Sequence, residues 1–323
     1  MEKTIRWAVC GLGKITKRFC RVLQRLPGVK LVACVSSSKE RALAFQKKYG
    51  LEAAYTYEEF AANPGAADAV YVANNMNMHR PTVNRFLNAG IPVLCEKSFC
   101  LNKAEAEEMT ACARKNNVLL MEAMWTRFLP SAEYVRGLFE KGELGKIKAI
   151  RAYFKAGIGH PPGSRVFRKA VGGGSVLDLA VYPAGYTHML LGVPESISAS
   201  GTLNKDGVDL RCSTEFRYPN NVTAKFDTSL LFMQIREDYN IYCEKAHVKI
   251  YMFYQSKKIK ISYADGKKVI KKFERSDGFE YEILHFNNLI REGKTESPIM
   301  THRATVEIMG LLEEINRQLG VVF

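Results

Sequence analysis

Ile5-Arg6-Trp7-Ala8-Val9-Cys10-Gly11-Leu12-Gly13 is the stretch that decides the fold. Its apolar and β-branched start predicts a buried strand, and a helical pattern follows from residue 15 to residue 26. Strand, glycine turn and helix form the context in which G-x-G binds a dinucleotide. Gly11 permits the tight turn, Gly13 lets the backbone approach a pyrophosphate, and the helix N-terminus offers free N–H groups. The third small position of the motif holds Thr16, and a plain tight turn is the alternative interpretation.

The end of the second expected strand, residues 30–35, indicates which cofactor is bound. An NAD site usually ends this strand in Asp or Glu, which binds the ribose 2′-hydroxyl. Here the strand runs into Ser36-Ser37-Ser38-Lys39-Glu40-Arg41, which has hydroxyls and two cations and no acid at the strand tip. This pattern favours NADP over NAD. In the alternative interpretation, Ser38 only caps the helix expected at 39–49.

Strands and helices then alternate through the first part of the chain. Strands are expected at 68–73, 92–95 and 118–122, and helices at 80–89 and 103–116. Such alternation predicts a doubly wound parallel sheet, which is the α/β Rossmann class.

Strand patterns dominate after residue 125. We expect strands at 147–154, 196–203, 210–218, 222–229, 239–243, 248–253 and 258–263, with a helix near 175–191. The second domain is therefore predicted to be α+β, with a large, mostly antiparallel open sheet that has one solvated face. We expect a dinucleotide-binding domain at 1–124, a substrate and dimerisation domain at 125–300, and a C-terminal helix at 301–323 that returns to the first domain.

Composition excludes several classes of protein. The 323 residues carry a net charge of +14, but the lysines are spread along the chain, and their densest run, 257–272, is typical of a solvated sheet face. A nucleic-acid binder is the alternative that this run leaves open. No run of 18 apolar residues predicts a membrane span. The eight scattered cysteines predict no metal site and indicate reduced thiols in a cytoplasmic protein.

Val93-Leu94-Cys95-Glu96-Lys97-Ser98 reads as a short buried strand that ends in an acid and a base. Ligands of open parallel sheets bind beyond the carboxyl ends of the strands, so Lys97 is a candidate for chemistry. A second informative run extends from Gly172 to Tyr182. Three glycines precede a helix on which Asp178 and Tyr182 lie four residues apart, on one face. The alternatives are a solvated lysine, a packed tyrosine and an acid favoured by the helix dipole.

Together, Gly11-Leu12-Gly13-Lys14-Ile15, Glu96-Lys97, Trp125-Thr126-Arg127-Phe128 and the 172–182 run resemble the glucose–fructose oxidoreductase/inositol dehydrogenase (Gfo/Idh/MocA) family. The resemblance covers nearly the whole chain and is greatest to the branch of dihydrodiol and NADP-dependent D-xylose dehydrogenases. It implies that Lys97 and Asp178 hold the substrate and that Tyr182 is the acid/base. Two positions depart from the family pattern: Ser98 stands where proline is usual, and Asn74-Asn75 where Thr-Pro is usual.

The expected reaction is reversible hydride transfer between NADP and a hydroxyl-bearing carbon of a sugar, polyol or cyclic diol. A nearby lysine cation would lower the pKa of Tyr182 from about 10 and favour its action as a base. Arg165 and His160, which precede the glycines, are further candidates for substrate contacts. The candidate cofactor-binding residues are Gly11, Leu12, Gly13, Lys14, Ile15, Ser36, Ser37, Ser38, Arg41, Ala73, Asn74, Asn75, His79, Glu96, Lys97, Trp125 and Arg127.

Two other functions stay open at this point. One is a cofactor-binding regulatory protein without turnover, because a fold does not fix function. The other is the chemistry of NAD-dependent glycosidases, in which the cofactor is used transiently. We also expect a homodimer that forms through the C-terminal sheet.

Overall fold

The computed structural model describes residues 3–155, 161, 163–231, 236–274 and 276–323. The chain forms two compact units. The first unit comprises Met1–Ala123 and Phe279–Val306, and the second comprises Met124–Gly278 and Glu307–Phe323.

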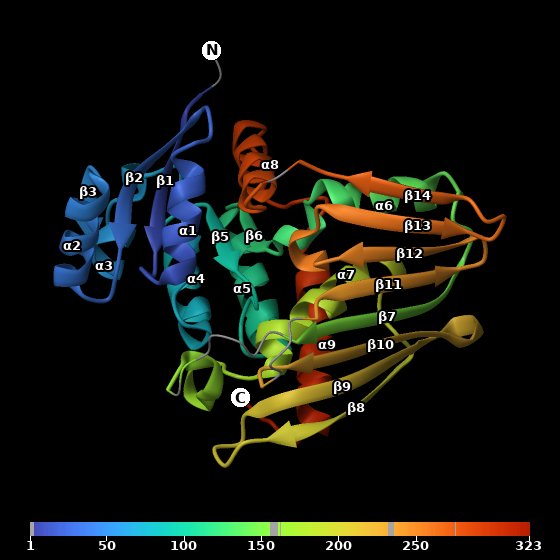
Figure 1. Cartoon of the computed structure of the whole chain (residues 1–323). Coiled ribbons are helices and arrows are strands. Elements are labelled where there is room, and N and C mark those ends of the chain that lie inside the picture. The colour runs from blue at the N-terminus through green and yellow to red at the C-terminus, as the bar shows by residue number, and fades with distance from the viewer. Residues whose placement is uncertain (1–2, 156–160, 162, 232–235, 275) are drawn as a thin grey trace. The chain divides into compact units, whose positions relative to one another are not determined.

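The first unit is built on a parallel sheet with the strand order β3-β2-β1-β4-β5-β6 (Figure 1). Its strands are β1 (Ile5–Cys10), β2 (Val29–Val35), β3 (Ala53–Tyr55), β4 (Ala69–Val72), β5 (Val93–Glu96) and β6 (Leu120–Ala123). Its helices are α1 (Lys14–Leu23), α2 (Lys39–Tyr49), α3 (Tyr57–Ala61), α4 (His79–Asn88), α5 (Lys103–Asn116) and α8 (Phe279–Arg291). The strand order reverses between β1 and β4, which is the switch point where doubly wound sheets bind ligands.

The core of this sheet is apolar on both faces. Every residue of β4, β5 and β6 is buried, as expected for parallel strands covered by helices. Phe19 of α1 stacks on Tyr71 of β4 with ring centroids 3.7 Å apart. The indole N–H of Trp7 on β1 donates to the Asn287 side chain of α8 at 2.9 Å, so the late helix α8 belongs to this core.

The second unit contains an eight-stranded sheet with the order β14-β13-β12-β11-β7-β10-β9-β8. Its strands are β7 (Ile147–Lys155), β8 (Ser196–Leu203), β9 (Asp209–Tyr218), β10 (Val222–Ser229), β11 (Asp238–Cys243), β12 (Ala246–Tyr251), β13 (Lys258–Tyr263) and β14 (Lys268–Lys272). Among the described strands of this second sheet, only β7 and β10 pair in parallel. Helices α6 (Pro130–Glu140) and α7 (Val181–Leu191) belong to this unit. Helix α9 (His302–Gln318) belongs to the first unit up to Val306 and to the second unit from Glu307.

Burial alternates along β7, β9 and β12, so one face of this sheet is covered and the other is solvated. Both halves of the expected fold class are therefore confirmed. The elements that were not predicted include β3, α3 and β14, and a π-helix stands at Val176–Ala180 where an ordinary helix was expected.

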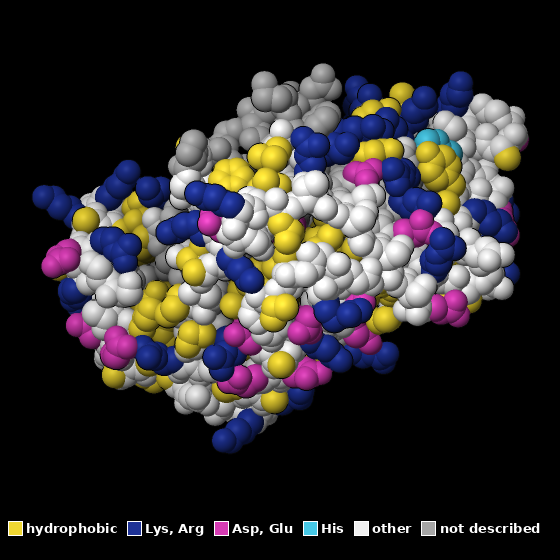
Figure 2. Space-filling model, turned by 90° about the horizontal axis from the view of Figure 1, so that it is seen from below, with side chains coloured by type: hydrophobic (Ala, Val, Ile, Leu, Met, Phe, Trp, Pro, Cys, Tyr) yellow, Lys and Arg dark blue, Asp and Glu magenta, His cyan; other side chains and the backbone are white. Residues whose placement is uncertain are grey.

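Basic side chains are scattered among acidic and apolar ones over the face shown in Figure 2, in keeping with the dispersed lysines of the sequence. Within the described part of the chain, no helix is both long and apolar enough to cross a membrane.

Candidate active site

A cleft of about 430 Å³ opens at the glycine turn of the first unit. It is lined by Gly11, Leu12, Gly13, Ser36, Ser37, Arg41, Tyr57, Ala73, Asn74, Asn75 and Met78. These residues lie after β1, β2, β3 and β4, at the carboxyl ends of strands on both sides of the switch point. Most of the candidate cofactor-binding residues thus lie around one cleft.

The two glycines of the turn differ in what surrounds them. Gly11 has φ +82°, and a Cβ atom there would overlap the backbone of Asn74 and lie 2.6 Å from the carbonyl carbon of Ala73. Gly13 has no atom within 4 Å of such a Cβ, so its open side faces space. Gly13 also begins α1 without a side-chain cap, and the first turn holds no acid. The helix N–H groups are therefore available to phosphate, and this turn fits a dinucleotide.

Thr16 occupies the third position of the glycine motif. Its side chain is fully buried, and its hydroxyl donates to the carbonyl oxygen of Gly11. The residue that departs from the usual small side chain thus ties α1 to the turn, because threonine supplies a hydrogen bond that glycine or alanine lacks.

The end of β2 presents a cation and hydroxyls to the cleft. Arg41 donates from Nη2 to the Ser37 hydroxyl at 2.9 Å. Ser38 caps α2 by accepting the backbone N–H of Arg41, and Lys39 instead binds Glu59 and the carbonyl oxygen of Ala54. No carboxylate is among the described residues that line this cleft. The chemistry of the lining therefore fits a 2′-phosphate better than a free ribose 2′-hydroxyl.

Tyr57 and Met78 line the cleft without having been predicted. The Tyr57 hydroxyl accepts a hydrogen bond from Asn74 Nδ2 at 3.4 Å, and burial raises its pKa. Tyr57 is the first residue of α3, one of the elements that were not predicted. Its place beside the cleft depends on β3 and α3. The capping box formed by Thr56 and Glu59 marks the start of α3 and is the signal in the sequence that could have indicated this helix.

The end of β5 carries Lys97 and the residues that fix its backbone. The Tyr71 hydroxyl donates to Glu96, whose other carboxylate oxygen accepts the backbone N–H of Lys97 at 3.1 Å. Lys97 is half-buried, and the peptide bond between Lys97 and Ser98 is cis. Glu96 therefore helps to fix the backbone at Lys97.

His79 joins the loop after β4 to the loop after β5. Its ring nitrogens lie 3.1 Å from the carbonyl oxygen of Phe99 and 3.2 Å from that of Asn74. Both contacts are to backbone acceptors, and a neutral imidazole donates to one of them only, so His79 is tied to the backbone of these loops.

In the second unit, Asp178 lies on the π-helix Val176–Ala180, which runs directly into α7. The Asp209 carboxylate of β9 accepts from the Ser175 hydroxyl at 2.7 Å and from the backbone N–H of Val176 at 2.8 Å, and so anchors the start of the π-helix. Arg165 donates to Asp178 at 2.8 Å. Because the Asp178 side chain is 11 % exposed and that of Arg165 is 45 % exposed, the pair stands at an accessible edge of the unit. The other sequence-predicted substrate contact, His160, lies outside the described residues.

Tyr182 is the second residue of α7 and is 9 % exposed. Its ring lies 5.3 Å from that of Phe154 and meets that of Tyr254 edge to face at 6.0 Å. Trp125 approaches the same Tyr254 ring at 6.3 Å. Tyr182 is therefore set in an aromatic cluster of the second unit.

Arg127 is almost wholly buried in the second unit. It donates from Nη2 to the Gly185 carbonyl oxygen and to His188 Nδ1, each at 2.9 Å. These contacts tie the turn that holds Arg127 to α7.

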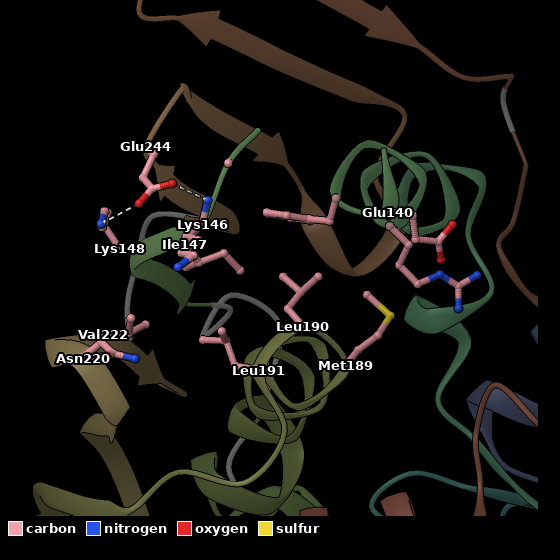
Figure 3. Close-up of a pocket in the computed structure, with 13 residues that line it drawn as sticks. Glu140, Lys146, Ile147, Lys148, Met189, Leu190, Leu191, Asn220, Val222 and Glu244 are labelled. Carbon is pink, nitrogen blue, oxygen red and sulfur yellow. Dashed lines mark hydrogen bonds and ion pairs between the residues drawn. The ribbon is translucent and has the colours of Figure 1, made fainter. Parts of the chain in front are cut away.

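A larger cleft of about 690 Å³ lies elsewhere in the second unit, between α6, α7 and the start of β7 (Figure 3). Apolar side chains such as Leu190 and Met189 form its middle, and the ion pair between Lys148 and Glu244 stands at one end. None of the sequence-predicted site residues lines it.

Comparisons with known proteins identify the family. Residues 5–124 match the model of the Gfo/Idh/MocA oxidoreductase family with an NAD-binding Rossmann fold, and residues 132–249 match the C-terminal domain of the same family. The chain belongs to this family. It is therefore an oxidoreductase, as the sequence predicted.

Relatives cover nearly the full chain. Trans-1,2-dihydrobenzene-1,2-diol dehydrogenase of Homo sapiens is 32% identical over 99% of this chain and 98% of its own length. The enzyme of that name from Xenopus tropicalis is also 32% identical, over 98% of this chain and 99% of its own length.

Two solved structures share the fold. Aldose-aldose oxidoreductase of Caulobacter crescentus has a TM-score of 0.88 at 23% identity, with 98% of each chain covered. KijD10, a 3-ketoreductase of Actinomadura kijaniata in complex with NADP and TDP-benzene, has a TM-score of 0.86 at 22% identity with the same coverage.

Proposed function

We propose that this oxidoreductase transfers hydride reversibly between NADP and a hydroxyl-bearing carbon of a sugar, polyol or cyclic diol. The observation that carries the proposal is the glycine-turn cleft, which offers Arg41, Ser37 and free helix N–H groups and holds no carboxylate among its described lining residues. The relatives named as diol dehydrogenases and the ketoreductase solved with NADP support the same chemistry.

The proposed chemistry assigns one role to each candidate side chain. Tyr182 takes the proton of the substrate hydroxyl during oxidation and returns it during reduction. Lys97 stabilises the developing negative charge on the substrate oxygen. Asp178, oriented by Arg165, holds a neighbouring substrate hydroxyl. Bound NADP supplies the hydride acceptor, and the protein supplies binding, orientation and proton transfer.

Each part of NADP is also assigned to particular residues around the cleft. Gly11, Leu12, Gly13 and the start of α1 are proposed to bind the pyrophosphate, and Ser37 and Arg41 the 2′-phosphate. The nicotinamide end of the cofactor site is proposed to be lined by Ala73, Asn74 and Asn75. The homodimer through the C-terminal sheet stays a prediction.

A Tyr182→Phe substitution tests the proposal. Wild-type protein is screened with NADP against aldoses, cyclic polyols and dihydrodiols, and NADPH absorbance is followed. We expect the variant to lose at least about 100-fold in turnover, because general acid–base catalysis commonly contributes that much. The variant should still bind NADPH with wild-type affinity, as measured by the quenching of NADPH fluorescence. Unchanged turnover in the variant would refute the role of Tyr182.

A further inference from the structure

Tyr254 is the aromatic side chain that connects the cluster around Tyr182. Its ring stacks on that of Phe154 at 5.0 Å with an interplanar angle of 23°. It meets Tyr182 edge to face at 6.0 Å, and Trp125 approaches it at 6.3 Å. Edge-to-face and offset stacked rings are favourable geometries, so any displacement of Tyr254 changes the surface beside Tyr182.

The backbone places Tyr254 against the start of β11. Met252, which follows β12, has φ +45°, and the chain then forms a short 3-10 turn at Phe253–Gln255. The backbone N–H of Phe253 donates to the carbonyl oxygen of Glu237 at 3.1 Å. This turn brings the Tyr254 side chain to the side chain of Glu237, although 17 residues separate them in the sequence.

The hydroxyl of Tyr254 is held from two sides. It accepts a hydrogen bond from Gln255 Nε2 at 2.7 Å and donates one to the Glu237 carboxylate. Glu237 is 7 % exposed, and burial raises its pKa to about 6. Its Oε2 atom is buried and has no hydrogen-bond partner among the protein atoms described. A buried carboxyl with a single protein hydrogen bond lowers the stability of the folded state. Its presence therefore points to a functional role for Glu237.

We propose that Glu237 is a positioning residue, which holds Tyr254 as an aromatic wall beside Tyr182 and so selects cyclic substrates with a flat apolar face. The inference rests on the proposed role of Tyr182. A rigid ring presents its face to the C–H face of a sugar ring or cyclic diol, whereas a flexible open-chain polyol lacks a fixed flat face. Ring rotation is restricted when both the ring and its hydroxyl have fixed partners.

Four variants test this pair. Tyr254→Phe keeps the ring and removes the hydroxyl, Glu237→Leu removes the acceptor, and Glu237→Gln keeps an acceptor oxygen. The double variant Glu237→Leu/Tyr254→Phe closes the mutant cycle. Tyr251→Phe is the matched control, because Tyr251 is also partly exposed on β12 but contacts the cations Lys249 and Lys258 instead.

We expect Tyr254→Phe and Glu237→Leu each to raise KM for cyclic substrates by about fivefold to tenfold, with kcat within about twofold, since one hydrogen bond is lost. KM for open-chain polyols should change less than twofold. Glu237→Gln should restore near wild-type KM, and the double variant should be no worse than the more affected single variant. Tyr251→Phe should behave as wild type.

Equal KM changes for cyclic and open-chain substrates, additive effects in the double variant, or wild-type KM in both single variants would overturn the inference. Thermal unfolding is followed for each variant; if Glu237→Leu fails to fold, Tyr254→Phe and Glu237→Gln still decide the outcome. Failure of the proposed function is separate, because it appears as full turnover in Tyr182→Phe. If Tyr182→Phe loses turnover but Tyr254→Phe keeps the wild-type KM, only the role of the Glu237 and Tyr254 pair is refuted.

Discussion

At the scale of single residues, the two glycines of the turn have different tasks. Gly11 is required by the fold, since a Cβ there would overlap neighbouring backbone at φ +82°. Gly13 faces open space, so its lack of a side chain matters only to what enters the cleft.

These environments give opposite expectations for alanine. Gly11→Ala should lower the free energy of unfolding by about 2–4 kcal/mol, because the clash is with backbone and the conformation is left-handed. Gly13→Ala should change it by no more than about 1 kcal/mol while weakening NADPH binding. Urea denaturation and NADPH fluorescence titration measure the two effects. A stable Gly11→Ala protein would contradict the account of the turn.

Asp209 is a buried carboxyl whose pKa burial raises from 3.8 to about 6 in the folded protein. Below about pH 3 it is largely protonated in both states, and its contribution to stability is then most favourable. As the pH rises toward 6, the Asp209 carboxyl ionises in the unfolded state before it does so in the folded state. The free energy of unfolding of the wild type therefore falls by about 3 kcal/mol relative to that of Asp209→Asn.

Denaturation of both proteins between pH 4 and pH 7 measures this difference. The advantage of Asp209→Asn over the wild type should grow with rising pH and level off above about pH 7. A difference in stability that does not vary with pH would show that Asp209 has an ordinary pKa.

At the scale of elements, the loop from β2 to α2 offers a direct test of cofactor choice. Arg41→Ala should raise the Kd for NADPH about tenfold or more, because a hydrogen bond to a charged phosphate is lost, and should leave the Kd for NADH nearly unchanged. Lys39→Ala is the matched control, since Lys39 is bound to Glu59 instead. An equal rise in the Kd for NADPH and the Kd for NADH in Arg41→Ala would contradict the 2′-phosphate assignment.

The elements with strong local patterns were predictable from the sequence. The helix Lys39–Tyr49, the helix Lys103–Asn116 and the strand Lys258–Tyr263 have the predicted bounds, because caps and alternation mark them in the sequence. The three-residue strand β3 is too short to show a period. The capping box of Thr56 and Glu59 marks the start of α3, but nothing local indicates that Tyr57 lies at the cleft.

The candidate site was predictable only where a motif carries it. Asp178 and Tyr182 were expected on one face of an ordinary helix, but a π-helix at 176–180 changes that periodicity. Asp209 anchors its start from a distant strand, and such tertiary contacts leave no local signal. The pairing of Glu237 with Tyr254 was missed for the same reason.

At the scale of the whole molecule, the residues with proposed roles are found in each of the two units. The first unit supplies the cofactor cleft and Lys97, and the second supplies Asp178, Tyr182 and the aromatic cluster. Family membership establishes an oxidoreductase but does not fix the substrate, and we propose that the Tyr254 side chain takes part in selecting it.

The transfer of label from substrate to cofactor is a direct test of hydride transfer by this protein. An active cyclic substrate deuterated at its hydroxyl-bearing carbon is incubated with the wild-type protein and NADP, and the NADPH formed is analysed by mass spectrometry. Hydride transfer from substrate to NADP predicts that each NADPH carries the deuterium of the carbon that was oxidised. Product formed without net NADPH, or NADPH free of deuterium, would contradict it.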